Sequence, residues 1–492
     1  MKDRIQNVVI VGGGSAGFIA ALTLNWRLPD LQVTVVHAPN IPVIGVGEST
    51  TSGVSVFLHE ILGLDRSEFF REVRPSWKLG LRLEWGDPGD SHFNYPFDGY
   101  IDHQLKGMSK LNGFHCLSDF KDCSLYSALM DRKKSPCLDR GGQMSIDHRY
   151  AYHIKNEAFI DYLRRKSEQK GTQLVEGEVV DVHRDETGDV TGLRLKDGRE
   201  LAGDLFIDCT GFRSLLLDKT LGEKYVDYKD ALFCDAAVIG SWQRDDEVLP
   251  YTTVETMDHG WCWRIDFLDV VTRGYVFSTA FCSADEAMRE MKRKNPQLGD
   301  DLQVLKFPSG RYENFWVGNV AAIGNAAGFV EPLEATALHL IIEQMRFLTE
   351  ALCDSDCRPG KAMQQIENER FRNMWDDVRD FLAVHYRFNR KLSTPFWEHC
   401  REHTELGKAA ALVDYYRHSG PSALAKILVE KSSIFNFSGY MIMLVGQRVA
   451  TAARSELTDA EQQIWSNYVN NVGHNAEQAM PMREALLRCY DG

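Results

Sequence analysis

One stretch near the start of the chain decides the fold: residues 8–21 read VVIVGGGSAGFIAA. A run of β-branched residues stops at three glycines and a small-residue segment follows, which predicts a strand, a tight turn and a helix N-terminus. The glycines with the spacing G-x-G-x-x-G are Gly12, Gly14 and Gly17. They permit the turn, the approach of a pyrophosphate and close packing of helix on strand. We therefore expect a dinucleotide site at the start of this helix. The motif alone is compatible with both NAD and FAD.

The following strands extend a Rossmann unit. Residues 31–36 (LQVTVV) form its second strand, and His37 stands at the end, where an acid usually contacts the ribose. Residues 177–201 predict a β-meander with two glycine turns, and residues 204–213 (DLFIDCTGFR) predict a buried strand that ends in a glycine turn. A Rossmann half with a meander crossover and such a late strand is how FAD domains of two-dinucleotide flavoproteins are built. This arrangement favours FAD over NAD.

The composition is that of a globular protein, and the 492-residue chain has a net charge of −14. The acidic balance argues against a nucleic acid partner, and no apolar run is long enough to cross a bilayer. Residues 1–4 lead straight into the first predicted strand, so we expect no signal peptide, a cytoplasmic location and reduced thiols for the eleven cysteines. The cysteines and histidines do not cluster with metal-ligand spacing, so we expect no metal site.

Several segments allow two interpretations from their residues alone. Residues 41–51 (IPVIGVGESTT) are either a surface loop or a strap over a cofactor. Residues 77–85 alternate strictly as one strand, and this pattern predicts that Lys78 is a solvated strand lysine. Trp261 and Trp263 share one face of a later strand, and that face is either core or cofactor wall.

A second glycine-rich turn, GNAAG at residues 324–328, leads into residues 331–337, which read EPLEATA. Pro332 suits a first helical turn, so we expect a helix to open there. Its N-terminus would be a second place for an anion or a flavin edge. By pattern alone, Glu334 and Thr336 are first-turn residues that suit the helix dipole.

Together these motifs resemble those of the flavin-dependent tryptophan halogenases. The resemblance covers most of the chain to about residue 400. Six motifs occur in the same order as in the family: GGGSAG (12–17), IPVIGVGEST (41–50), WKLG (77–80), DLFIDCTGFR (204–213), WCWRI (261–265) and GNAAGFVEPLE (324–334). Many families share the glycine motif, whereas the strap, the lysine strand and the EPLE segment together are specific. The resemblance implies an α/β fold of the Rossmann-type, FAD-binding, flavin-monooxygenase-like class, with a β-rich substrate part and a helical C-terminal region.

We expect residues 1–344 to form the FAD-binding core, with inserted substrate segments at about 86–150 and 215–310. Residues 86–150 read as loops and short pieces. We expect residues 345–492 to be mostly helical and packed on the core.

The resemblance also implies the chemistry. FAD arrives as FADH2 from a separate NADH-dependent flavin reductase and reacts with dioxygen. A chloride or bromide is oxidised to hypohalous acid, which travels through the interior to an aromatic substrate such as an indole. The implied FAD contacts are Gly12, Gly14, Ser15, Ala16, Gly17, His37, Val46, Gly47, Glu48, Ser49, Val179, Gly324, Asn325 and Leu338.

Lys78 would hydrogen-bond the hypohalous acid or carry it as a haloamine, which a buried lysine does well because the neutral amine is the nucleophile. Glu334 would orient Lys78 or take the proton from the halogenated ring. The pair that would hold the halide at a helix N-terminus is Thr336 and Ala337. Trp261 and Trp263 would keep the organic substrate away from the flavin and so suppress direct hydroxylation.

Several positions depart from the family pattern. Asp266 stands where the family signature ends in proline, and Ala335 and Ala337 stand where serine and glycine are usual. Residues 415–418 and 432–437 do not reproduce the aromatic and acidic residues that clamp free tryptophan. We therefore expect another aromatic substrate, which is a simpler indole, a phenol, a larger natural product or a peptide-borne side chain.

Two alternatives stay open. One is an aromatic hydroxylase on the same fold, which needs neither Lys78 nor Glu334. The other is a flavin-binding protein without catalysis, for which the altered end of the tryptophan strand would be the cause. A homodimer is expected by family habit alone.

Overall fold

The computed structural model describes residues 4–38, 47–117, 119–140, 143–429, 433–453 and 456–491. The chain forms two compact units, and each is assembled from three separate segments. Unit 1 consists of residues 1–74, 154–227 and 307–375, and unit 2 of residues 75–153, 228–306 and 376–492. The expected division into a core of residues 1–344 and a helical region of residues 345–492 stays a prediction.

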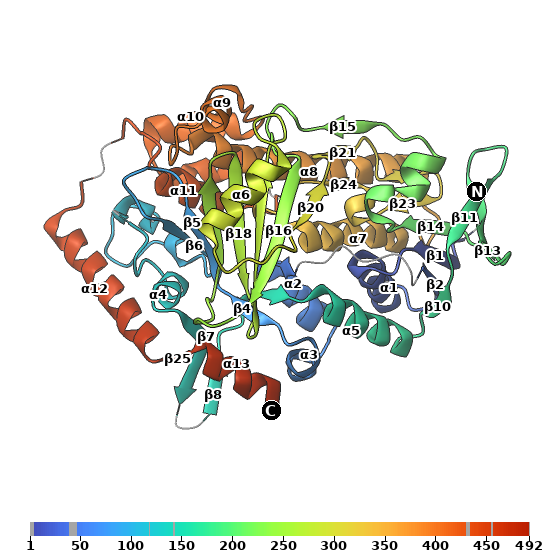
Figure 1. Ribbon diagram of the computed structural model, residues 1–492, viewed down its shortest axis with the longest axis horizontal. Coiled ribbons are helices and arrows are strands. Elements are labelled where there is room, and N and C mark those ends of the chain that lie inside the picture. The colour runs from blue at the N-terminus through green and yellow to red at the C-terminus, as the bar shows by residue number, and fades with distance from the viewer. Residues whose placement is uncertain are drawn as a thin grey trace. The chain divides into compact units, whose positions relative to one another are not determined.

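Unit 1 is organised around a six-stranded sheet in the order β10-β2-β1-β14-β23-β22 (Figure 1). Its strands are β1 (Asn7–Val11), β2 (Gln32–His37), β10 (Gln173–Glu176), β14 (Leu205–Asp208), β22 (Trp316–Val317) and β23 (Val320–Ala322). The five strands from β10 to β23 run parallel, and β22 is antiparallel to β23. Val8 and Val9, which lie on opposite faces of β1, are both buried, as expected for a parallel sheet covered on both faces. This sheet confirms the predicted Rossmann-type α/β fold.

Unit 1 also contains helices and the predicted meander. Helix α1 (Ser15–Arg27) packs against α5 (Asn156–Gln169) and α7 (Ala337–Asp354). The predicted meander is present as β11 (Val179–Arg184), β12 (Val190–Leu195) and β13 (Glu200–Ala202). The remaining elements are β3 (Glu48–Ser49), α2 (Ser52–Val56), η1 (Phe57–Ile61), α3 (Arg66–Val73), η4 (Gly211–Arg213), η5 (Leu215–Thr220), β15 (Tyr225–Asp227), β21 (Gly310–Tyr312), η6 (Gly324–Ala326) and β24 (Gly328–Phe329).

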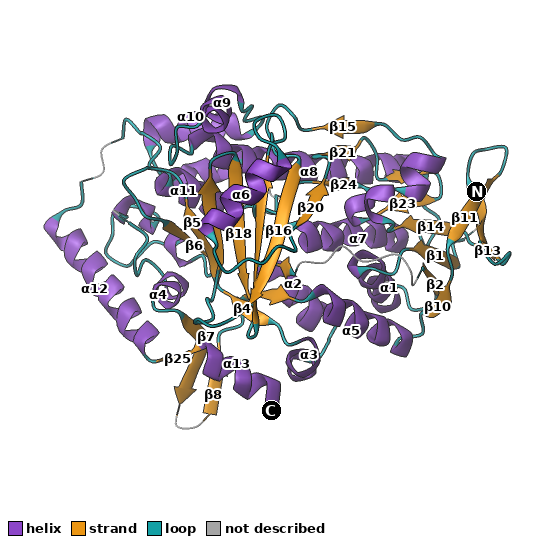
Figure 2. Cartoon of the chain, in the orientation of Figure 1, coloured by secondary structure: helices purple, strands orange, loops and turns teal. Residues whose placement is uncertain are grey.

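Unit 2 contains a seven-stranded sheet, drawn in orange in Figure 2, in the order β20-β16-β19-β18-β17-β5-β6. Its strands are β5 (Gly80–Glu84), β6 (Phe93–Pro96), β16 (Ala236–Gln243), β17 (Thr252–Met257), β18 (Gly260–Asp266), β19 (Val270–Phe277) and β20 (Gln303–Lys306). Helix α6 (Ala284–Lys294) opens with a capping box between Ser283 and Glu286 and packs against β16 and β19 (Figure 1). Ala287 and Met291 of this helix join the apolar core with Tyr275 and Phe277.

The other elements of unit 2 lie before and after this sheet in the chain. Between residues 75 and 153 they are β4 (Ser76–Lys78), η2 (Tyr100–Asp102), η3 (Gly113–Cys116), α4 (Leu125–Asp131), β7 (Lys134–Arg140), β8 (Gln143–Ile146) and β9 (Ala151–Ile154). Towards the C-terminus they are α9 (Pro395–His403), α10 (Ala409–Ser419), η7 (Ala423–Leu428), α11 (Phe437–Gly446), α12 (Asp459–Glu477), β25 (Ala479–Pro481) and α13 (Met482–Asp491). Helix α8 (Lys361–Phe388) runs from the last segment of unit 1 into unit 2. The segment of residues 86–150 therefore holds more regular structure than its sequence predicts, because β7 is paired with the distant strand β25.

Two predicted elements have different boundaries. The alternating stretch of residues 77–85 is two strands, since the Leu79 amide donates to the Pro250 carbonyl and the chain passes from β4 to β5 there. Helix α7 begins at Ala337 and not at Pro332, because the Ala335 amide bonds the Pro332 carbonyl in a turn and Ala335 has a φ of +56°. This left-handed residue interrupts the helix that the sequence predicts.

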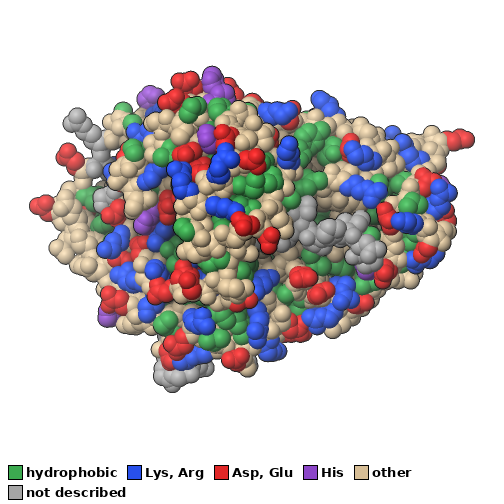
Figure 3. Space-filling model, in the orientation of Figure 1, with side chains coloured by type: hydrophobic (Ala, Val, Ile, Leu, Met, Phe, Trp, Pro, Cys, Tyr) green, Lys and Arg blue, Asp and Glu red, His purple; other side chains and the backbone are tan. Residues whose placement is uncertain are grey.

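The surface is mixed in charge. On the face shown in Figure 3, acidic and basic side chains are interspersed without a large area of one sign. Among the described helices, none combines the length and the apolar character that crossing a membrane requires.

Candidate active site

The first glycine turn joins β1 to α1 and leaves the start of the helix open. A Cβ atom on Gly12, which has a φ of +125°, would lie 2.3 Å from the Cys209 carbonyl oxygen. One on Gly17 would lie 1.9 Å from the Gly12 carbonyl oxygen, whereas one on Gly14 would meet no described atom within 4 Å. Gly14 is the N-cap, and no described side chain caps the helix, whose first turn contains Ser15 and Ala16. Free N–H groups and open space at Gly14 fit a dinucleotide pyrophosphate.

The other predicted FAD contacts of this half lie around the same turn. His37 ends β2, and its Cβ atom would be 2.4 Å from a Cβ atom on Gly13. Val179 begins β11 and is buried. In the strap, Gly47 has a φ of +89°, and Val46 lies outside the described residues.

Strand β3, Glu48–Ser49, holds a half-buried carboxylate. Burial raises the pKa of Glu48, and a hydrogen bond of 3.3 Å from Asn156 Nδ2 opposes that shift.

The second glycine motif meets the first in the tertiary structure. A Cβ atom on Gly324 would lie 3.3 Å from the Cβ atom of Ala16 and 3.1 Å from Cγ1 of Ile341. Gln344 of helix α7 binds the same turn, accepting from the Gly324 amide at 3.0 Å and donating to the Ala322 carbonyl at 3.3 Å. Gln344 was not among the predicted site residues. The sequence feature that could have identified Gln344 is a polar residue on the apolar face of a helix, because a buried side-chain amide needs hydrogen-bond partners.

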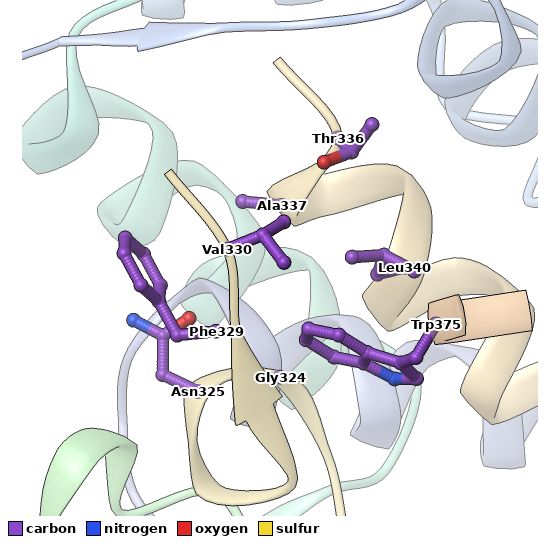
Figure 4. Close-up of a pocket in the computed structure, with 8 residues that line it drawn as sticks. All are labelled: Gly324, Asn325, Phe329, Val330, Thr336, Ala337, Leu340 and Trp375. Carbon is purple, nitrogen blue, oxygen red and sulfur yellow. The ribbon is translucent and has the colours of Figure 1, made fainter. Parts of the chain in front are cut away.

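The N-terminus of helix α7 lines a small pocket in unit 1 (Figure 4). Thr336 is the N-cap, 2% exposed, and Ala337 is the first helical residue. The first turn of α7 contains no acidic residue, so its N–H groups can receive an anion. The residues that line the pocket are Gly324, Asn325, Phe329, Val330, Thr336, Ala337, Leu340 and Trp375. Leu338 is buried in the same helical turn.

Trp375 contributes one wall of this pocket from helix α8, and no sequence motif pointed to it. Glu334, 3% exposed, lies in the turn just before α7. The pocket therefore combines an aromatic wall, small residues and a helix N-terminus, and the helix N-terminus suits a small anion.

Lys78 is the last residue of β4 in unit 2 and is fully buried. The prediction from alternation, a solvated lysine, is wrong, because β9 pairs with β4 and places Ala151 opposite Lys78. Its Nζ atom lies 5.0 Å from the centroid of the Phe97 ring. A buried lysine on a rigid strand is costly, and such groups are concentrated at functional sites.

Trp261 and Trp263 lie on β18 of the same unit, with ring centroids 6.0 Å apart at an angle of 54°. Both are buried, at 1% and 7% exposed. Gly274 of β19 stands opposite Trp263 and leaves room for its indole.

A family model described as tryptophan halogenase matches residues 7–463. The chain belongs to the tryptophan halogenase family. This halogenase is 34% identical over 441 residues to the tryptophan 6-halogenase ThaL of Streptomyces albogriseolus, covering 84% of this chain and 82% of that protein. It is 32% identical over 447 residues to the tryptophan 7-halogenase RebH of Lentzea aerocolonigenes, covering 85% and 83%.

Solved structures of halogenases share the fold of this chain. The halogenase superposes on MibH, a lanthipeptide tryptophan 5-halogenase, with a TM-score of 0.91 and 34% identity over 99% of this chain and 94% of that one. It superposes on Xcc4156, a flavin-dependent halogenase from Xanthomonas campestris, with a TM-score of 0.89 and 27% identity over 99% and 98%. The protein is thus a flavin-dependent halogenase, an oxidoreductase that uses FADH2 and a halide as co-substrate and acts on an aromatic compound. The hydroxylase and the non-catalytic alternatives are set aside.

Proposed function

We propose that this halogenase places chlorine or bromine on an electron-rich indole ring other than that of free tryptophan. The relatives are named for tryptophan, which supports an indole, and MibH is named for a tryptophan in a lanthipeptide. The departures at residues 415–418 argue against a clamp for the free amino acid. The observation that supports the function most is the full burial of Lys78 on a strand beside Phe97.

The overall reaction balances as one aromatic C–H bond, one halide, one dioxygen, FADH2 and one proton giving a C–halogen bond, FAD and two waters. Bound FADH2 supplies the two electrons that, with dioxygen, turn the halide into hypohalous acid. Thr336 and Ala337 hold the halide at the N-terminus of α7, where the helix dipole and free N–H groups favour an anion. Gly12, Gly14 and Gly17 hold the pyrophosphate of the cofactor.

Lys78 carries the oxidised halogen to the ring, by hydrogen bonding or as a haloamine. Glu334 orients the lysine or accepts the ring proton that the halogen replaces. Trp261 and Trp263 keep the organic substrate from the flavin.

The test supplies the protein with FAD, a flavin reductase, NADH, indole and either bromide or chloride, and reads the product by mass spectrometry. A halogenated product is expected from the wild type and no halogenated product from Lys78→Ala. Lys133→Ala is the matched control, because Lys133 is a half-exposed lysine of unit 2 paired with Glu247. Halogenation that survives Lys78→Ala, or an oxygenated product alone, would contradict the proposal.

A separate NADH-dependent flavin reductase supplies the FADH2, so the purified protein with FAD and NADH alone is expected not to turn over. We also propose a cytoplasmic location, where such a reductase and NADH are present, and a homodimer. Size-exclusion chromatography with light scattering tests the dimer.

A further inference from the structure

A buried ion-pair network occupies the end of the tryptophan strand, where Asp266 replaces the proline of the family signature. The carboxylate of Asp266, fully buried, accepts hydrogen bonds from the guanidinium groups of Arg244 and Arg264. Asp246 closes the network, 2.6 Å from both arginines. Each buried charge therefore has a partner of opposite sign, as burial requires.

Arg244 also fixes the backbone that follows Asp266. Its Nε atom donates to the Phe267 carbonyl at 2.7 Å, and its own amide donates to the Asp269 carbonyl at 2.9 Å. The side chain and the backbone amide of Arg244 thus both bind the turn between β18 and β19, and the side chain is 1% exposed. The bonds from Arg244 to the residues after Asp266 thereby help to fix the position of the Asp266 carbonyl.

That carbonyl is bonded to the lysine strand. The hydroxyl of Ser76 in β4 donates to the Asp266 carbonyl oxygen, and both groups are fully buried. Ser76 and Lys78 are two residues apart on a strand, so their side chains project on the same side of β4. The bond therefore ties the strand that bears Lys78 to the strand that bears Trp261 and Trp263.

A histidine completes the connection. His153 of β9 is the cross-strand partner of Ser76, with Nδ1 3.4 Å from Ser76 Oγ and Nε2 2.8 Å from Thr252 Oγ1. Burial, and then the positive charge of Lys78, lower the pKa of His153 to about 3, so the ring is neutral. Because the Ser76 proton goes to a carbonyl, Ser76 can only accept from His153. This assigns the ring proton to Nδ1 and makes Nε2 the acceptor for the Thr252 hydroxyl.

We propose that Asp266, Ser76 and His153 form a positioning network for Lys78, in which the ion pairs of Asp266 set the register between the lysine strand and the tryptophan strand. The network acts through backbone and hydroxyl groups, so these residues are positioning residues. This inference rests on the proposed function of Lys78 for its catalytic consequence.

The experiment compares Ser76→Ala with Ser76→Thr, which keeps the hydroxyl, and with Asp266→Asn, which keeps the carbonyl but weakens the ion pairs. Ser135→Ala is the matched control, because Ser135 of β7 is also fully buried and its hydroxyl also donates to a backbone carbonyl, that of Met480. Hydrogen–deuterium exchange of a peptide spanning residues 75–85 reports the order of β4 without any turnover. Steady-state kinetics with indole report kcat and KM separately.

Ser76→Ala and Asp266→Asn are expected to speed exchange in residues 75–85 by about tenfold, the effect of one lost buried hydrogen bond. The kcat for halogenation should fall by a similar factor while KM for indole stays within about twofold. Ser76→Thr should restore both, and Ser135→Ala should change neither. Unchanged exchange in both variants, or an equal effect of Ser135→Ala, would overturn the proposal. A wild type that yields no halogenated indole would contradict the proposed function instead, and the exchange result would still decide the network.

Discussion

The indole of Trp263 fills the space that a side chain at Gly274 would need: a Cβ atom there would lie 1.8 Å from Cζ2 of Trp263. The two residues are cross-strand partners in β18 and β19. A glycine with no unusual φ thus has a packing reason to be glycine.

Gly274→Ala is expected to displace Trp263 and to destabilise the protein by about 1–3 kcal/mol, the usual cost of overpacking a buried site. Thermal or urea unfolding measures this change. Gly299→Ala is the control, since a Cβ atom there would meet no described atom within 4 Å. Equal stability of the two variants would show that Trp263 relaxes without cost.

Gly14→Ala and Gly17→Ala should separate cofactor binding from folding. In Gly17→Ala the new Cβ atom would lie 1.9 Å from the Gly12 carbonyl oxygen, so the substitution should cost about 1–3 kcal/mol of stability. In Gly14→Ala the new Cβ atom would lie in open space. The free energy of unfolding of this variant without cofactor should therefore stay within about 0.5 kcal/mol of the wild-type value. Its FAD affinity should nevertheless fall by about tenfold, or about 1.4 kcal/mol, because the methyl group takes the place of the pyrophosphate. Flavin fluorescence measures the affinity. An unchanged Kd of Gly14→Ala for FAD would contradict a pyrophosphate site at this turn.

Thr336→Val should raise the KM for bromide or chloride by about tenfold, because it removes a hydroxyl next to the anion while it keeps the shape of the side chain. Thr349→Val is the matched control on the same helix, since Thr349 is equally buried and its hydroxyl donates to the Met345 carbonyl at 2.7 Å. Halide titrations of the initial rate distinguish the two. A normal halide KM for Thr336→Val would place the halide elsewhere.

Stability should depend on pH through His153. Its pKa is about 3 in the folded protein and near 6.5 when unfolded, so below pH 6.5 the unfolded state binds more protons. The stability from this group is complete above pH 6.5 and falls by about 1.4 kcal/mol per pH unit between pH 6.5 and 3. The slope of unfolding free energy between pH 6.5 and 5 should therefore be less steep in His153→Asn than in the wild type. Equal slopes would mean that His153 is protonated in the folded state.

Local features of this protein could be predicted from residue order. The turn at Gly12–Gly17, the second strand β2 and the meander of β11 to β13 depend on neighbours a few residues away, and all are present. The start of α7 could not be predicted from Pro332, because the left-handed backbone of Ala335 is selected by the tertiary structure against the preference of alanine.

The sequence by itself determined the Rossmann unit, the family and the residue types of the candidate site, because these depend on short motifs. Only the tertiary structure decided that Lys78 is buried rather than solvated, since this depends on β9, more than 70 residues further along the chain. It also brought Gln344 and Trp375 to the turn at Gly324, and Ser76 and His153 to Asp266. Burial and pairing between distant segments are properties of the packed chain, and alternation along one strand shows which residues share a face but not what covers that face.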